Sequence, residues 1–132
     1  MNTIKEGDIF YRTIEITSQI METFAVISGD YNPIHVDEVF AKNMGFKGRV
    51  VYGNILGLLV SALVGEGLPM KEVMIISEQL NFKSIIYIGD IIRLSATVST
   101  ISEATGVIEL KLNFLNNSED KVANGKLQIK LI

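Results

Sequence analysis

Cysteine is absent from this chain, histidine occurs once, and proline occurs twice. Without cysteine there is no disulfide, no thiolate metal site and no cysteine nucleophile. The single histidine, His35, excludes a metal site built from several histidines. Because 48% of the 132 residues are apolar and only 20% are charged, the chain buries enough surface to fold, and we expect a compact globule rather than a disordered segment.

Clustered positive charge is also missing. The formal net charge is −3, and lysine and arginine form no run, so nucleic acid and anionic membranes are not expected partners. Residues 1 to 8 lack the basic start and the apolar core of a signal peptide, which favours a cytoplasmic location. The longest apolar stretch, residues 50 to 68, is interrupted by glycine and polar residues, so it predicts a buried core helix and not a membrane span.

The apolar pattern predicts one α+β domain over residues 1 to 132. Loose alternation over residues 8 to 16 is typical of a strand, whereas residues 53 to 65 are apolar on nearly every side and predict a helix wrapped by other structure. Four further strands are predicted over residues 72–88, 91–102, 106–116 and 121–132. We therefore expect a curled antiparallel sheet of about five strands around one helix. A sheet edge and one helix face are expected to be left for a second copy to cover, which favours a homodimer.

Two short helices are predicted between the first strand and the buried helix. The first is capped by Thr17 or Ser18 and stops near Gly29, and the second opens at Asp37. The segment between them is expected to be a loop.

That loop carries a candidate acid–base pair. Asn32-Pro33 is a turn signal, because proline fixes its own φ and pushes the residue before it out of the α region. The turn can fold Asp30 back toward His35, and a neutral imidazole near a carboxylate can move a proton near neutral pH. The alternative is that His35 is a structural residue and Asp30 a helix-end residue.

The start of the helix over residues 53 to 65 is the second candidate element. Unpaired N–H groups at a helix N-terminus point outward with the positive end of the dipole, so the N–H of Gly53 would stabilise a carbonyl oxygen that gains negative charge. The alternative is a glycine that permits close packing. Small and polar residues recur on one face of this helix, which would border a narrow cavity: Asn54, Gly57, Ser61 and Gly65.

These residues resemble a known family. Residues 28 to 37, SGDYNPIHVD, resemble the hydratase motif of the (R)-specific enoyl-CoA hydratases, also called MaoC-like dehydratases, which have the hotdog fold. Residues 48 to 53, GRVVYG, resemble the start of the family's central helix. Residues 80 to 83, LNFK, together with Gly89-Asp90, resemble its later strand signature, so the resemblance covers nearly the whole chain.

The resemblance implies a hydro-lyase of fatty acid metabolism that adds water reversibly, in the syn sense, to a trans-2-enoyl thioester. Asp30 and His35 would hold and activate the water, and the N–H of Gly53 would bind the thioester oxygen. Ser61 would support the site, and Asn32 would fix the loop. The resemblance implies dimers or larger assemblies and no metal or redox cofactor; coenzyme A or acyl carrier protein carries the substrate.

The chain departs from the family pattern at three places. Tyr52-Gly53 stands where the family usually has His-Gly, Ile85 stands where it usually has proline, and Asn54 stands where it often has a hydrophobic residue. Tyr52 and Asn54 are therefore further candidates for contact with the substrate.

Two other functions stay open. An acyl-CoA thioesterase of the same fold would usually need a carboxylate on the central helix, and residues 53 to 65 contain none. A non-catalytic subunit that binds acyl-CoA or an acyl carrier is suggested by the residues at positions 52 and 54. Candidate contacts for the phosphates of a carrier are Lys47, Arg49 and Lys83.

Overall fold

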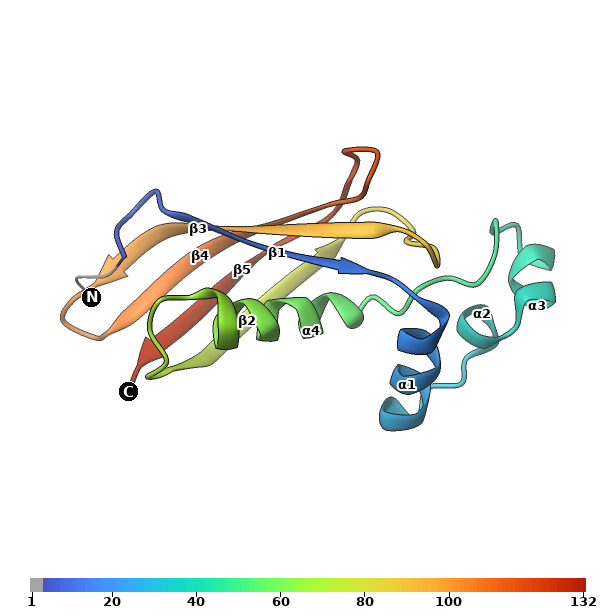
Figure 1. Cartoon of the computed structure of the whole chain (residues 1–132), viewed down its shortest axis with the longest axis horizontal. Helices are drawn as coiled ribbons and strands as arrows, with labels where there is room; N and C mark the ends of the chain where they lie inside the picture. Colours follow the sequence, from blue (N-terminus) through green and yellow to red (C-terminus); the bar gives the residue numbers. More distant parts are fainter. Residues whose placement is uncertain (1–3) are drawn as a thin grey trace.

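The structure is a computed structural model that describes residues 4–132. Five antiparallel strands form one sheet in the spatial order β1-β3-β4-β5-β2. The strands are β1 (Ile9–Glu15), β2 (Val73–Phe82), β3 (Ile91–Ser102), β4 (Val107–Leu115) and β5 (Lys121–Leu131). The helices are α1 (Ser18–Ser28), α2 (Pro33–Val36), α3 (Glu38–Asn43), α4 (Ile55–Ala62) and the π-helix η1 (Leu63–Gly67). Figure 1 shows α4 along one face of the curled sheet, with α1, α2 and α3 beyond one end of it.

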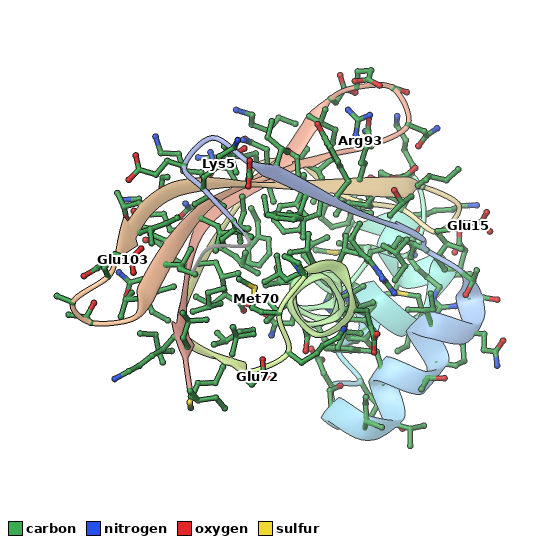
Figure 2. The ribbon with its side chains drawn as sticks, turned by 60° about the vertical axis from the view of Figure 1, so that its left-hand side comes forward. Lys5, Glu15, Met70, Glu72, Arg93 and Glu103 are labelled. Atoms are coloured by element: carbon green, nitrogen blue, oxygen red, sulfur yellow. The ribbon has the colours of Figure 1, made fainter. Side chains whose placement is uncertain are left out.

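The core lies between α4 and the sheet. Alternation along the central strands puts every second side chain on the face toward α4, as the sequence predicts. Figure 2 looks nearly along α4 and shows side chains filling the space between this helix and the strands. The buried side chains include Leu94 and Val98 of β3, Leu110 and Phe114 of β4, Leu127 and Ile129 of β5, and Ile55, Leu56, Leu59 and Val60 of α4. The predicted sheet wrapped around one helix is therefore confirmed.

One side of α4 is not covered by this chain. Leu58 is 44% exposed, and Asn54, Ser61 and Gly65 are exposed beside it. The sheet curls around the opposite side of α4 only (Figure 1), which leaves one face of the helix open, as the sequence predicts. No helix within residues 4–132 is both long enough and apolar enough to cross a membrane.

Strand β2 is shorter than predicted. It was expected over residues 72 to 88 but ends at Phe82, because the N–H groups of Lys83 and Ser84 both donate to the carbonyl oxygen of Val122, which ends the regular ladder with β5. The chain then leaves the sheet, and Tyr87 forms an isolated bridge with Val50. The freed residues become one wall of the site described below.

Local capping sets the short helices. The hydroxyl oxygen of Thr17 accepts a hydrogen bond from Ile20 N at 3.2 Å, and Gly29 ends α1 with a left-handed φ of 74°, as predicted. Asp37 caps α3, also as predicted, by accepting from Phe40 N at 3.0 Å. The end of α1 and the start of α3 thereby define the segment that carries the candidate pair.

His35 was expected in a loop, and that prediction is wrong. The side chain of Asn32 accepts a hydrogen bond from Ile34 N at 3.2 Å, and Pro33 occupies the first turn that follows. Together they start the four-residue helix α2, because proline is well suited to the first helical position. His35 therefore lies within α2, whereas Asp30 lies in the connection before it.

Candidate active site

A cavity of about 350 Å³ lies where the α1–α2 connection meets the start of α4 and the segment after β2. It brings together five of the predicted site residues, Asp30, His35, Tyr52, Gly53 and Asn54. Its remaining wall is mostly apolar and is formed by Phe24, Val50, Val51, Phe82, Ser84, Ile85 and Ile86. An apolar cavity with a few convergent polar groups is typical of a small-molecule site.

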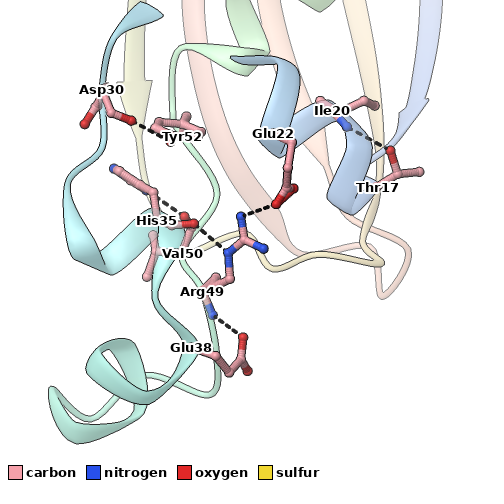
Figure 3. Close-up of polar contacts among 9 residues, drawn as sticks. All are labelled: Thr17, Ile20, Glu22, Asp30, His35, Glu38, Arg49, Val50 and Tyr52. Atoms are coloured by element: carbon pink, nitrogen blue, oxygen red, sulfur yellow. Dashed lines mark hydrogen bonds and ion pairs between the residues drawn. The ribbon is translucent and has the colours of Figure 1, made fainter. Parts of the chain in front are cut away.

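The ring of His35 is held in one tautomer. Its Nδ1 lies 2.6 Å from the carbonyl oxygen of Val50. Since a carbonyl oxygen only accepts, Nδ1 carries the proton, and Nε2 of the neutral ring is left as an acceptor. Figure 3 shows this second nitrogen pointing away from Val50, on the side where Asp30 lies. His35 therefore offers a base to the cavity.

Asp30 uses one carboxylate oxygen for the backbone turn. Its Oδ1 accepts from Asn32 N at 3.0 Å, and its own N–H donates to the hydroxyl oxygen of Ser28 at 3.1 Å. Its Oδ2 has no hydrogen-bond partner within residues 4–132. One oxygen thus orders the turn, while the other is free to act on a ligand. Asn32 lies outside the cavity lining, and its side chain caps α2.

Tyr52 contacts both members of the pair. Its hydroxyl donates to the backbone carbonyl of Asp30 at 2.7 Å, and its ring stacks on His35 with centroids 4.1 Å apart and planes at 28° (Figure 3). The other side of the ring packs against the ring of Phe24, and the two ring centroids are 4.5 Å apart. Burial raises the pKa of the Tyr52 phenol, the Asp30 carboxylate adds to that rise, and the Arg49 guanidinium opposes it. The hydroxyl therefore remains protonated at neutral pH and donates.

Gly53 precedes α4 in a tight turn. The N–H groups that follow bond three residues back, from Ile55 to Tyr52 O and from Leu56 to Gly53 O. The N–H of Gly53 itself has no hydrogen-bond partner within residues 4–132. A Cβ at this position would lie 2.9 Å from Cε1 of Phe82, so only glycine lets that ring rest against the backbone. Gly53 thus offers a free donor beside an apolar wall.

Asn54 and Ser61 occupy different surroundings on α4. Asn54 is the residue at the helix cap, its side chain makes no capping bond, and it lines the cavity. Ser61 is exposed about two turns further along and does not line it. Within one chain, the expected role of Ser61 at the site therefore has no contact to support it.

The side chain of Arg49 is engaged in contacts within the protein. Its Nε donates to the carbonyl oxygen of His35 at 2.7 Å, and a terminal nitrogen pairs with Glu22 at 3.1 Å, with the arginine side chain only 15% exposed. It joins α1 and α2 to the segment before α4, so it is not available as the phosphate contact that the sequence suggested. Lys47 and Lys83 do not line the cavity.

Two aromatic residues of the site were not predicted. Phe24 of α1 is half-buried against the core and lines the cavity. Phe82 is 54% exposed at the end of β2 and covers Gly53. Its place in the LNFK segment was the available signal. Within residues 4–132, no group of three or more histidine and carboxylate side chains is arranged to hold a metal ion.

Comparison with known proteins identifies the family. A sequence model described as MaoC like domain matches residues 1–115. The chain is 30% identical over 108 residues to an (R)-specific enoyl-CoA hydratase of Aeromonas caviae, covering 82% of this chain and 81% of that protein. It is 39% identical over 87 residues to a 3-hydroxybutyryl-CoA dehydratase of Methylorubrum extorquens, covering 66% and 55% respectively. Hydratases and dehydratases of this kind are hydro-lyases.

Solved structures agree with the sequence comparison. The (R)-hydratase of A. caviae involved in PHA biosynthesis superposes with a TM-score of 0.94 at 25% identity, over 100% of both chains. A protein from Archaeoglobus fulgidus superposes with a TM-score of 0.90 at 31% identity, over 98% of this chain and 80% of that one. The hotdog fold implied by the sequence motifs is therefore confirmed, and the chain belongs to the MaoC-like family.

Proposed function

We propose that this protein is an (R)-specific enoyl-CoA hydratase, or equally a 3-hydroxyacyl-thioester dehydratase when the reaction runs in reverse. The observation that carries the proposal is the meeting of Asp30, His35 and the free N–H of Gly53 at one cavity. The relatives named as hydratases and dehydratases support it.

The geometry suits addition of water across the double bond that is conjugated to a thioester carbonyl. In the proposed reaction, Oδ2 of Asp30 and Nε2 of His35 hold the attacking water. The water oxygen bonds to C3 as one group takes a proton from the water, and that same proton is passed through the other group to C2 on the same face. The carbonyl oxygen gains negative charge as C2 becomes enolate-like, and the N–H of Gly53 stabilises that charge. Atoms balance, because the product is substrate plus one water.

Coenzyme A or acyl carrier protein belongs to the substrate in this scheme. No step requires a metal or a prosthetic group, because the two side chains and one backbone N–H supply the acid, the base and the oxyanion donor. The acyl chain would lie along the apolar wall that Phe24, Phe82 and Ile86 provide.

A direct assay tests the proposal. Crotonyl-CoA is mixed with the protein, loss of the enoyl absorbance is followed, and the product is identified by chiral chromatography. We expect (R)-3-hydroxybutyryl-CoA with no free thiol. Release of thiol would instead show a thioesterase, and binding of crotonyl-CoA without turnover would show a binding subunit; either result overturns the proposal.

The thioesterase alternative keeps one structural observation in its favour. Glu78 of β2 lies against α4, since a Cβ at Gly57 would be 3.6 Å from its Oε2, and burial raises the pKa of this carboxyl group. Glu78 does not line the cavity that holds Asp30 and His35. The hydratase assignment therefore accounts for more of the site.

A homodimer is part of the proposal. The outer edge of β2 is unpaired within this sheet, Met74 and Ile76 on that strand are 50% and 45% exposed, and Leu58 is exposed on the neighbouring helix α4. We expect sedimentation to give twice the mass of one chain. Leu58→Asp should raise the dimer dissociation constant at least about tenfold, because it places a charge on the face of α4 that the partner subunit would cover. Val39→Asp is the matched control, because Val39 is 69% exposed on α3; equal effects of the two changes would contradict this interface.

Gly53→Ala should narrow the cavity and leave the fold intact. The added methyl meets the end of the Phe82 ring, which is 54% exposed and free to swing away. We expect the free energy of unfolding to fall by less than about 1 kcal/mol, while KM for crotonyl-CoA rises about tenfold as the displaced ring enters the cavity. Thermal melting and steady-state kinetics measure the two effects. An unchanged KM would show that the Phe82 ring does not form a wall of the substrate-binding site.

A further inference from the structure

In the part of the chain that the structure describes, a single hydrogen bond ties the turn that carries Asp30 to the rest of the protein. Within residues 4–132, the other bonds of residues 29 to 32 are local: they run to α1, to α2 or within the turn itself. The exception is the bond from the Tyr52 hydroxyl to the backbone carbonyl of Asp30, which spans 22 positions in the sequence. The position of this carboxylate relative to the cavity therefore depends on one phenol group.

His35 is held by the same short segment, but redundantly. Arg49 donates to its backbone carbonyl, the carbonyl oxygen of Val50 accepts from its ring, and Tyr52 stacks on its face. Loss of any one of these contacts leaves the other two in place. Residues 49 to 52 thus orient both partners of the pair, and only Asp30 relies on Tyr52 alone.

Burial gives the Tyr52 ring a fixed position from which to do this. The residue is 2% exposed, and its ring is packed between Phe24 and His35. A side chain whose rotamer is locked by packing transmits its own position to whatever its polar end contacts. Here that polar end reaches an otherwise exposed turn.

We propose that Tyr52 is a positioning residue for the reaction: its hydroxyl holds the Asp30 turn against the cavity while its ring fixes the plane of His35, so that the carboxylate and the imidazole face the same water. This inference rests on the proposed function. Tyr52 acts through Asp30 and has no role as acid or base.

The hydroxyl can be removed without the ring. Tyr52→Phe keeps the stack on His35 and the packing on Phe24 and deletes only the bond to Asp30. We expect kcat for hydration of crotonyl-CoA to fall by about 10- to 100-fold, because small misplacements of a reacting group are costly, with KM within about twofold of the wild type. Tyr31→Phe is the matched control, because Tyr31 is 60% exposed beside Asp30 and should leave both constants unchanged.

A double-mutant cycle separates positioning from a general structural role. If the hydroxyl acts through the carboxylate, Tyr52→Phe added to Asp30→Asn should lower kcat by less than about twofold further. Losses that multiply would overturn the proposal, as would a Tyr52→Phe enzyme with the wild-type kcat. Each rate is expressed per folded molecule, from circular dichroism at the assay temperature, so a fall in folded fraction alone cannot mimic the effect.

A readout independent of turnover completes the test. Hydrogen exchange at the N–H of Asn32, which donates to Asp30, should become at least about tenfold faster in Tyr52→Phe and stay unchanged in Tyr31→Phe. A wild-type protein that does not hydrate crotonyl-CoA would overturn the proposed function alone, and exchange would then decide whether the hydroxyl orders the turn. Unchanged exchange would overturn the positioning role whatever the activity.

Discussion

Asp30→Asn and His35→Ala should each lower kcat for hydration of crotonyl-CoA by about 10² to 10⁴. Asp30→Asn is the cleaner of the two changes. An asparagine side-chain oxygen still accepts from Asn32 N, as Oδ1 of Asp30 does now, so the turn keeps its geometry and only the basic carboxylate is lost. His35→Ala removes Nε2 and, with it, the bond to Val50 and the stack on Tyr52.

The two changes should not multiply. Groups that act on one water form a unit, and removal of the second group costs little after the first is gone. The kcat of the double variant is therefore expected to lie within about tenfold of the kcat of the less active single variant. Asp120→Asn is a matched control for loss of one negative charge, because Asp120 is exposed in the turn between β4 and β5. Full activity in both single variants would remove the assigned roles of Asp30 and His35.

Gly125→Ala should give the largest loss of stability. Gly125 of β5 pairs with Leu80 of β2, and a Cβ there would overlap the backbone oxygen of Gln79. A backbone atom in a paired strand cannot swing aside as an exposed ring can, so β2 must shift away from β5. We expect the free energy of unfolding to fall by about 1 to 3 kcal/mol or more, which corresponds to a melting temperature lower by about 4 to 12 °C.

Chemical and thermal unfolding measure this effect, and Gly67→Ala supplies the control. A Cβ at Gly67 would meet only the side chain of Leu63, at an ordinary contact distance of 3.6 Å, so that change should leave stability within about 1 kcal/mol of the wild type. Gly125→Ala should also impair the active site, because the segment that follows β2 lines the cavity with Ser84, Ile85 and Ile86. Wild-type stability in Gly125→Ala would show that the two strands part there without cost.

Much of the scaffold could be read from local patterns. The cap at Thr17, the left-handed stop at Gly29 and the start of α3 at Asp37 depend on hydrogen bonds that span only three or four residues. The alternation along the later strands likewise follows from which side of each strand is apolar. The motif over residues 28 to 37 led to the MaoC-like family, which the comparisons confirm.

Other features required the tertiary structure, because they depend on which surfaces meet. Strand β2 ends at Phe82, since Lys83 and Ser84 bond to the neighbouring strand outside the regular ladder. Which face of α4 stays open also depends on the fold, since the sheet curls around the opposite side of the helix only (Figure 1). An apolar pattern shows that a face is to be buried and does not show what buries it.

The features of the site also fall into those visible in the sequence and those that required the tertiary structure. The residue types of Asp30, His35 and Gly53, and their place in a family motif, were visible in the sequence. The contacts of Arg49 with Glu22 and with His35 O, and the hydrogen bond from Tyr52 to the Asp30 turn, were decided only by folding. Each joins residues 14 to 27 positions apart, and no local pattern encodes such a distance. The sequence by itself thus determined the family and the chemical groups, whereas the tertiary structure decided how those groups are held, because side-chain contacts arise only when distant elements pack together.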